Sequence, residues 1–158
     1  MSNVRHVRIP PTREIYQDTS NGTEAAAEGH YHGYTVNDDQ DEAFIQFLVP
    51  HDYHGLVEAT LVLIPWLAAT PMTVTVASTH TSVHENYATN VSANMICSFN
   101  SGNGTLQEVD ISHIIDSIAA NRLKANDYVG VYVYRETGQN TNALVLGVRF
   151  RYKVFKHK

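Results

Sequence analysis

The sequence has one cysteine in 158 residues, which excludes any disulfide bond within the chain. This residue, Cys97, lies between Ile96 and Phe99 in a stretch that is typical of a β-strand. A thiol in that setting is most often buried and inert. The cysteine content therefore argues against a disulfide-stabilised scaffold and against a cysteine nucleophile.

Long apolar runs are absent as well. The longest, residues 56–69, is interrupted by Glu58, Thr60 and Pro65, whereas a membrane helix needs roughly 20 apolar residues. The first residues carry arginine and proline and lack the apolar stretch of a signal peptide. We therefore expect a protein made in the cytoplasm that has no membrane partner.

Positive charge is missing from most of the chain. No Lys or Arg occurs between Glu14 and Asn121, although this stretch holds 14 of the 16 acidic residues. The chain, with a net charge of −5, thus has an acidic middle and basic ends. The basic ends could contact an acidic neighbouring protein. The overall acidity argues against nucleic-acid binding. The residues predicted to contact a neighbouring protein are Arg5, Arg8, Arg13, Arg151 and Lys153.

Residues 1–42 lack the periodicity of a folded element. They contain two adjacent prolines, an Asn-Gly turn signal, a weak helical segment at residues 24–28 and an acidic run at residues 38–42. Such a segment cannot supply its own core. We expect it to form an extended N-terminal arm that is ordered only on another surface, while residues 4–9 could pair as an edge strand.

From residue 43 the chain changes to short apolar runs, several of them alternating with polar residues, and the domain is predicted to span residues 43–158. About eight short strands with turn signals between them predict an all-β fold, an antiparallel β-sandwich of jelly-roll type. The predicted strands in this region are residues 43–49, 56–64, 72–77, 91–99, 106–111, 127–135 and 143–152. Isoleucines at helical spacing, preceded by Asp110 or Ser112 as a cap, predict one short helix over about residues 111–121.

The strand at residues 127–135 carries an aromatic stripe. Tyr128, Tyr132 and Tyr134 alternate with Val129, Val131 and Val133 and therefore lie on one face. A symmetry axis between subunits could bury this stripe, and we predict a subunit interface there. The alternative is that the tyrosines belong to the ordinary core.

Nine histidines are the one compositional excess. Two residues at His-x-His spacing share a face of a strand, which suits zinc, copper or iron. The sequence has neither the carboxylate that such a site would need nearby nor the His-Glu-x-x-His motif. We therefore predict no cofactor and no catalysis, and a metal-dependent enzyme remains as an alternative that would use His30, His32, His51 and His54.

Aromatic residues near the loops leave a further alternative open. Trp66 and Tyr87 could stack on a sugar ring with Asn86 or Asn90 beside them, and core or interface packing is an equally good interpretation. In the first case the chain would be a carbohydrate- or receptor-binding module.

Three stretches resemble small jelly-roll proteins encoded among the structural genes of tailed bacteriophages. The first runs from Phe47-Leu-Val-Pro-His-Asp-Tyr53 into residues 56–64, the second spans residues 106–131, and the third is Val145-Leu-Gly-Val-Arg-Phe-Arg-Tyr152. The resemblance covers about residues 43–152 and leaves the arm unmatched. It implies a trimer-forming virion component that decorates a capsid or is part of a tail or fibre.

The leading prediction is thus a structural protein and not an enzyme. We expect a capsid decoration or cementing protein that binds the capsid surface as a homo-oligomer, with a trimer favoured. Its partners would be copies of itself and the major capsid protein or other virion proteins. The binding module would instead belong to a phage tail or fibre.

Overall fold

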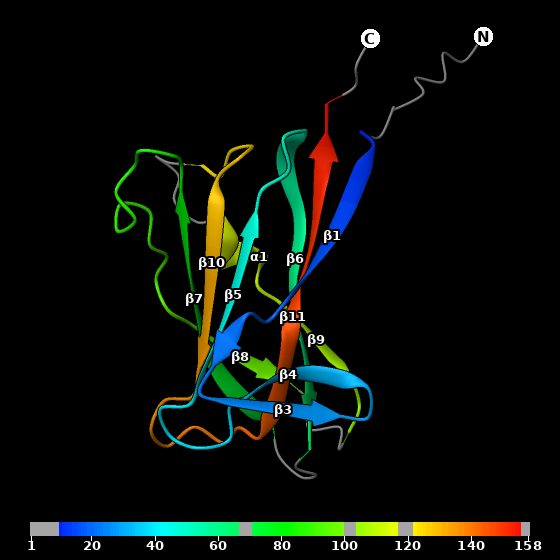
Figure 1. Cartoon of the computed structure of the whole chain (residues 1–158), viewed down its shortest axis with the longest axis vertical. Coiled ribbons are helices and arrows are strands. Elements are labelled where there is room, and N and C mark those ends of the chain that lie inside the picture. The colour runs from blue at the N-terminus through cyan, green and yellow to red at the C-terminus, as the bar shows by residue number, and fades with distance from the viewer. Residues whose placement is uncertain (1–9, 67–70, 100–103, 117–121, 156–158) are drawn as a thin grey trace, which may run out of the picture.

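The computed structural model describes residues 10–66, 71–99, 104–116 and 122–155, which form two antiparallel sheets packed face to face (Figure 1). The six-stranded sheet contains β1 (Thr12–Asp18), β3 (Glu24–Glu28), β4 (Tyr31–Thr35), β6 (Tyr53–Pro65), β9 (Gln107–Asp110) and β11 (Ala143–Val154). The five-stranded sheet contains β2 (Asn21–Gly22), β5 (Glu42–Leu48), β7 (Met72–Thr81), β8 (Met95–Phe99) and β10 (Tyr128–Tyr134).

The eight strands from β4 to β11 are connected as a jelly roll. One sheet has the order β4-β11-β6-β9 and the other has the order β5-β10-β7-β8. If these strands are numbered from one to eight along the chain, the two orders become 1-8-3-6 and 2-7-4-5. This is the arrangement of a Greek-key chain folded into two sheets. The predicted antiparallel jelly-roll sandwich is confirmed.

All seven strands predicted after residue 43 are present, with bounds that differ by a few residues. Their alternation builds the core between the sheets, because the inward side chains of each strand meet those of the opposite sheet. In β10, for example, Val129, Val131 and Val133 are buried. Phe150 from β11 contacts Phe47 from β5, with ring centroids 5.1 Å apart. The apolar faces predicted from the sequence therefore face one another.

Strand β11 does not keep one alternation along its length. Leu144 and Leu146 belong to a small cluster on the outer side of the sheet, whereas Val148 and Phe150, which follow at the same spacing of two, lie in the main core. The register against β6 shifts between Val145 and Gly147. A β-bulge of this kind inserts one residue and reverses the faces of those that follow.

The N-terminal arm is the main correction to the predicted fold. Residues 12–18 form β1, which pairs along its whole length with β11, from Thr12 opposite Lys153 to Asp18 opposite Gly147. The chain then adds β2 to the other sheet. Residues 12–42 are thus part of the sandwich and are ordered on the chain's own strands. The edge strand predicted at residues 4–9 lies outside the described residues.

The segment at residues 24–28, expected to be weakly helical, is instead β3, and it forms a hairpin with β4. Ala26 packs against the small outer cluster, which Val62 and Leu146 help to form. Long-range pairing and this burial outweigh the helical preference of alanine and glutamate. The hairpin lies at one end of the sandwich, opposite the end where both chain termini leave (Figure 1).

The predicted helix is present as α1 (Ser112–Ile115). Ile111, Ile114 and Ile115 are buried, as their spacing predicts. Asp110 accepts hydrogen bonds from the backbone N–H and the hydroxyl of Ser112, so it organises the turn into the helix. The helix ends at Ile115 with Asp116 as its C-cap, earlier than predicted, and residues 117–121 lie outside the described residues. No helix in the described ranges is long and apolar enough to span a membrane.

Candidate functional site

The aromatic stripe of β10 lies on the outer face of the five-stranded sheet and not in the core. Tyr128 is 58% exposed, and Tyr132 and Tyr134 are half-buried. Tyr128 lies opposite Leu48 of β5, which is itself 48% exposed. The predicted face is therefore an outward surface, and the interpretation of these tyrosines as ordinary core residues is wrong.

One end of this face is an ordered aromatic stack. The ring of Tyr132 stacks on Phe44, with centroids 5.0 Å apart, and on Tyr134 at 4.6 Å. The Tyr132 hydroxyl donates a hydrogen bond of 2.8 Å to Glu42, and the Tyr134 hydroxyl donates one to Glu136. Burial and the neighbouring Glu42 raise the pKa of Tyr132 to about 12. Both rings are held in place with neutral hydroxyl groups.

The other end of the face is hollowed at Gly130. A Cβ atom on this glycine would meet nothing within 4 Å. The result is a shallow cavity of about 540 Å³ between β5, β10 and β7. Leu48 and Tyr128 form its apolar wall, and Thr79 and Thr81 form the opposite wall. This surface, from Phe44 to Leu48 and from Tyr128 to Tyr134, is called the aromatic face below.

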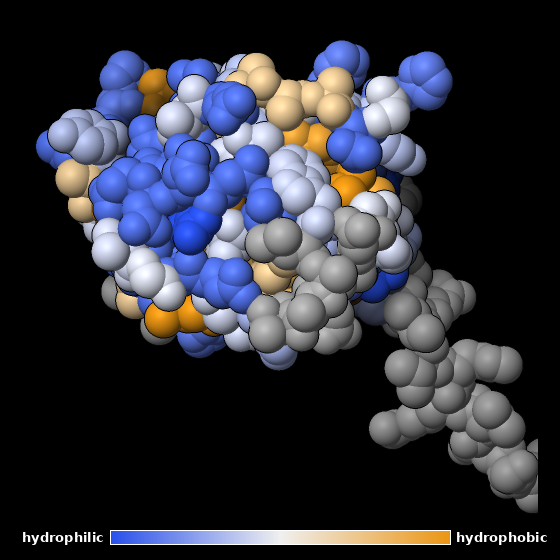
Figure 2. Space-filling view, turned by 90° about the horizontal axis from the view of Figure 1, so that it is seen from below, coloured by the Kyte–Doolittle hydropathy of each residue, from blue (hydrophilic) through white to orange (hydrophobic). Residues whose placement is uncertain are grey.

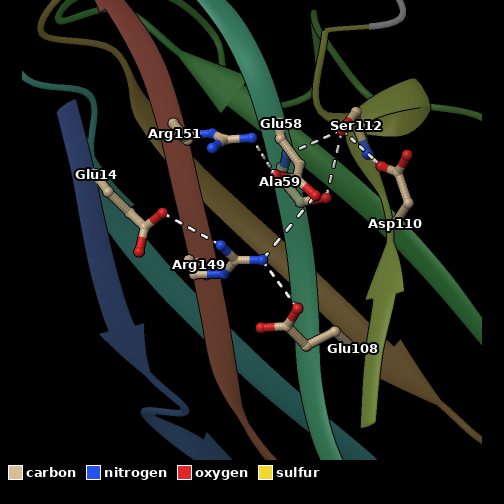
Figure 3. A network of polar contacts seen from close by, with 8 residues as sticks. All are labelled: Glu14, Glu58, Ala59, Glu108, Asp110, Ser112, Arg149 and Arg151. Atoms are coloured by element: carbon tan, nitrogen blue, oxygen red, sulfur yellow. Dashed lines mark hydrogen bonds and ion pairs between the residues drawn. The ribbon is translucent and has the colours of Figure 1, made fainter. Parts of the chain in front are cut away.

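The outer face of the six-stranded sheet is different, because its charges are paired within the chain (Figure 3). The Arg149 guanidinium lies 2.9 Å from Glu108, 3.3 Å from Glu14 and 4.0 Å from Glu58. Arg151 lies 2.9 Å from the other oxygen of Glu58. These contacts join β1, β11, β6 and β9. The network stabilises the sheet and neutralises most of its own charge.

This pairing bears on the basic residues predicted to contact a neighbour. Arg13 already binds Asp52, at 2.5 Å, and Arg151 binds Glu58. Lys153 is exposed at the end of β11. Arg5 and Arg8 lie outside the described residues. Among the described residues, Lys153 is thus the predicted contact residue that is exposed and forms no ion pair with another described residue.

The histidines considered as metal ligands do not come together. His30 and His32 lie at the β3–β4 hairpin. His51 lies in the turn between β5 and β6, and His54 is at the start of β6. The ring of His54 packs on Phe155 near the C-terminus, with centroids 4.1 Å apart. The two pairs therefore lie at opposite ends of the sandwich. Within the described ranges, no group of three or more His, Cys, Asp or Glu residues could hold a metal ion.

The predicted sugar platform is also not assembled. Trp66 follows the end of β6 and packs against the small outer cluster. Tyr87 and Asn86 lie in the loop that follows the end of β7. Strand β7 has ten residues and is roughly 30 Å long at about 3.3 Å per residue, so this loop is far from the start of the strand. Trp66 lies near the start of β7, because the backbone N–H groups of Trp66 and of Thr73 in β7 both donate to carbonyl oxygens of one loop, residues 140–142. Asn90 is buried. These residues cannot contact one ligand.

A buried polar cluster was not predicted. Asp127 accepts a hydrogen bond of 2.5 Å from the Ser82 hydroxyl, and its other oxygen lies 3.5 Å from Nδ1 of His80. That second oxygen also accepts the backbone N–H of Lys124. The serine is bonded to the aspartate and not to the imidazole, so it is not a nucleophile activated by a base. The cluster fixes the loop after β7 to the start of β10.

Cys97 is buried on β8, as predicted, and is 2% exposed. Burial raises the pKa of its thiol to about 11. The thiolate that nucleophilic chemistry requires is therefore scarce at neutral pH.

A second cleft, also not predicted, lies where the β3–β4 hairpin leans over the six-stranded sheet. Its volume is about 750 Å³. The end of the molecule that carries the hairpin shows separate hydrophobic areas set in hydrophilic surface (Figure 2). The residues that line the cleft include Tyr16, Asp18, His30, Tyr31, His32, Tyr34, Val62 and Leu146. The run Gly-His-Tyr-His-Gly-Tyr in the sequence marks part of this site, but its partners on β1 and β11 are distant in sequence.

Comparison with known proteins gives little beyond the fold. No family model matches the chain, and no curated protein matches it. Among solved structures, it is similar to an exo-β-1,3-galactanase from Phanerochaete chrysosporium in complex with galactose, at 13% identity and a TM-score of 0.40. The similarity covers 92% of this chain and 30% of that enzyme. This similarity is too weak to assign the activity of that enzyme to this chain.

Proposed function

We propose that this protein is a non-enzymatic structural component of a bacteriophage virion that self-associates through its aromatic face. A trimer is the favoured assembly, and the capsid surface is the favoured location. The observation that carries the proposal is the outward exposure of Tyr128 and Leu48 beside each other on the five-stranded sheet.

The chemistry of the aromatic face suits a subunit contact. Tyrosine combines a large apolar ring with one hydroxyl group, and aromatic residues are enriched where proteins meet. The stacked rings of Tyr132 and Tyr134 are already ordered, so little side-chain freedom is left to lose on association. Ile96 on β8, at the edge of the same sheet, adds another apolar group that is 63% exposed. The same face has few charges that would need to be desolvated.

The six-stranded sheet is less suited to that contact. Its outer face carries the Arg149 network, whose charges would have to be removed from water on association. It remains available for a second surface, such as an acidic capsid, to which the exposed Lys153 could contribute. A decoration protein needs both kinds of surface, one for its own copies and one for the particle.

Native mass measurement tests the self-association. The wild-type protein should have a mass near 53 kDa, three times the 17.6 kDa of one chain. Tyr128→Asp places a charge on the aromatic face and should give the single-chain mass. Tyr87→Asp is the matched control, since Tyr87 is 78% exposed and lies on the loop after β7, outside the strands that form the aromatic face, and it should keep the wild-type mass.

A wild-type protein that stays at 17.6 kDa at tens of micromolar would contradict the self-association. An unchanged mass for Tyr128→Asp would contradict the choice of face. The virion location needs its own experiment. The protein should co-sediment with purified particles of the phage that encodes it and remain bound after washing. Its complete absence from washed particles would contradict that part of the proposal.

A further inference from the structure

We propose that the cleft under the β3–β4 hairpin binds a carbohydrate. The cleft lies on the six-stranded sheet, away from the aromatic face, so the inference goes beyond the proposed self-association and is independent of it. It also differs from the sugar platform predicted around Trp66 and Tyr87, whose members the structure separates.

The cleft is built by two close backbone contacts. A Cβ atom at Gly33 would lie 2.2 Å from the carbonyl oxygen of Val145, so glycine lets β4 approach β11 at this point. A Cβ atom at Gly147 would lie 2.2 Å from the carbonyl oxygen of Gln17 and 2.9 Å from the hydroxyl of Tyr16. These contacts set the hairpin and β1 close to the same segment of β11. The space between them is therefore bounded by ordered strands on both sides.

The floor of the cleft is apolar and its walls are aromatic. Val62 and Leu146, from the small outer cluster, form part of the floor. Tyr16 is 49% exposed and Tyr31 is 56% exposed, and both line the cleft. Burial and, after it, the charges of Asp18 and Tyr31 raise the pKa of Tyr16. Two aromatic rings thus stand uncovered in one concave site.

Polar groups stand beside these rings. Asp18 can accept hydrogen bonds from hydroxyl groups, and the exposed imidazoles of His30 and His32 can both donate and accept them. A pyranose sugar presents an apolar face of C–H groups, which packs on an aromatic ring, and an edge of hydroxyl groups, which needs mixed donors and acceptors. The cleft provides both kinds of contact, and its volume falls in the usual range for small-ligand sites.

Other ligand classes fit less well. An anion would meet Asp18, and no Lys or Arg is among the lining residues. A metal ion would need a third ligand beside the two histidines, and Asp18, although it lines the cleft, does not form a metal-binding group with them among the described residues. A purely apolar ligand would leave the carboxylate and the imidazoles without partners. A neutral saccharide of one to three rings satisfies the whole lining.

The test is a glycan array followed by saturation-transfer NMR with maltose, lactose and N,N′-diacetylchitobiose. We expect at least one saccharide to bind, and Tyr31→Ala to weaken its binding at least tenfold. Tyr31 is exposed, so its removal should leave the fold intact. Tyr87→Ala, the matched control outside the cleft, should bind like the wild type. His32→Ala is a second variant that removes a polar contact and leaves both rings in place.

Three results would overturn the inference: no saccharide binding in either assay, equal binding by Tyr31→Ala and the wild type, or chemical-shift changes at the cleft with zinc chloride or inorganic phosphate but with no saccharide. The Tyr128→Asp variant separates this inference from the proposed function. It should lose self-association and still bind the saccharide through the intact cleft.

Discussion

The hydroxyl oxygen of Tyr16 lies over Gly147, only 2.9 Å from the position that a Cβ atom on this glycine would take. The carbonyl oxygen of Gln17 is closer still, at 2.2 Å. Cβ contacts in proteins are not that short, so glycine is the residue that lets β1 close over β11 here. Both the pairing of the N-terminal strand and the shape of the cleft depend on this contact.

Gly147→Ala should therefore destabilise the fold by about 1–3 kcal/mol, the usual effect of forcing an extra methyl group into a packed site. Gly130→Ala is the matched control, since a Cβ atom there meets nothing within 4 Å. Alanine also restricts the unfolded chain more than glycine does, so this control should be neutral or stabilising by up to about 1 kcal/mol. Urea unfolding measures both changes, and equal losses of stability would contradict the contact.

The phenol of Tyr132 should make stability depend on alkaline pH. Its pKa rises from 10.0 to about 12 on folding, so the fold favours the neutral form. This contribution is complete below pH 10 and is lost as the pH rises towards about 12, because the unfolded chain loses its proton first. The urea midpoint should fall over this window.

Tyr132→Phe should show a smaller fall of the midpoint between pH 10 and about pH 12, since it has no phenol to ionise. Some fall should remain, because burial also raises the pKa of Tyr53. Tyr87→Phe leaves the bond from Tyr132 to Glu42 in place and should follow the wild type. A Tyr132→Phe curve that coincides with the wild-type curve would exclude this tyrosine as a source of the effect.

Removing Arg149 should test the charge network on the six-stranded sheet. Arg149→Met leaves Glu14, Glu58 and Glu108 without this partner and should lower the free energy of unfolding by up to about 1 kcal/mol at low salt. The difference should shrink in 1 M sodium chloride, where the screening length is only about 3 Å. Arg122→Met, which removes one exposed pair with Asp116, should change stability less. A salt-independent loss would point to packing and not to charge.

Cys97 should be unreactive in the native protein. Its thiol is 2% exposed, and burial raises its pKa to about 11, so both access and thiolate content are low. A chromogenic disulfide reagent at pH 8 should modify it far more slowly in the folded chain than in guanidinium chloride. Modification at equal rates in the two conditions would show that β8 opens readily.

The sequence predicts the strands from residue 43 onward well, because strands such as β5 and β10 are buried on one face, which imposes a period of two, whereas the second half of β6 and the first half of β11 are nearly continuous apolar runs buried on both faces. Strands β1 to β4 were not predicted, since most of their side chains are exposed and carry no such period. For β3, the local preference even points to a helix, and only its pairing with β4 and the contact of Ala26 decide the outcome. Exposed strands at the edge of a sheet are specified by their partners more than by their own residues.

The candidate sites follow the same rule. The aromatic stripe of β10 could be predicted, because Tyr128, Tyr132 and Tyr134 lie on one strand and its period fixes their face. The histidine pairs could not be placed relative to each other, because spacing within a strand does not show which loops meet. The cleft combines Tyr16 of β1 with Tyr31 of the hairpin, and their presence in one cleft depends on how both elements pack against β11.

The antiparallel pairing of β1 with β11 brings Thr12 opposite Lys153, and the backbone N–H of Val154 bonds to the carbonyl of Pro11. A short linker could therefore join the two ends and allow new termini to be opened in the exposed loop after β7, giving a circular permutant. Reporters or cargo joined before β1 or after β11 would likewise be attached at the same end of the sandwich. The end of the sandwich that carries the β3–β4 hairpin and its cleft would stay accessible when many copies are attached side by side to one surface.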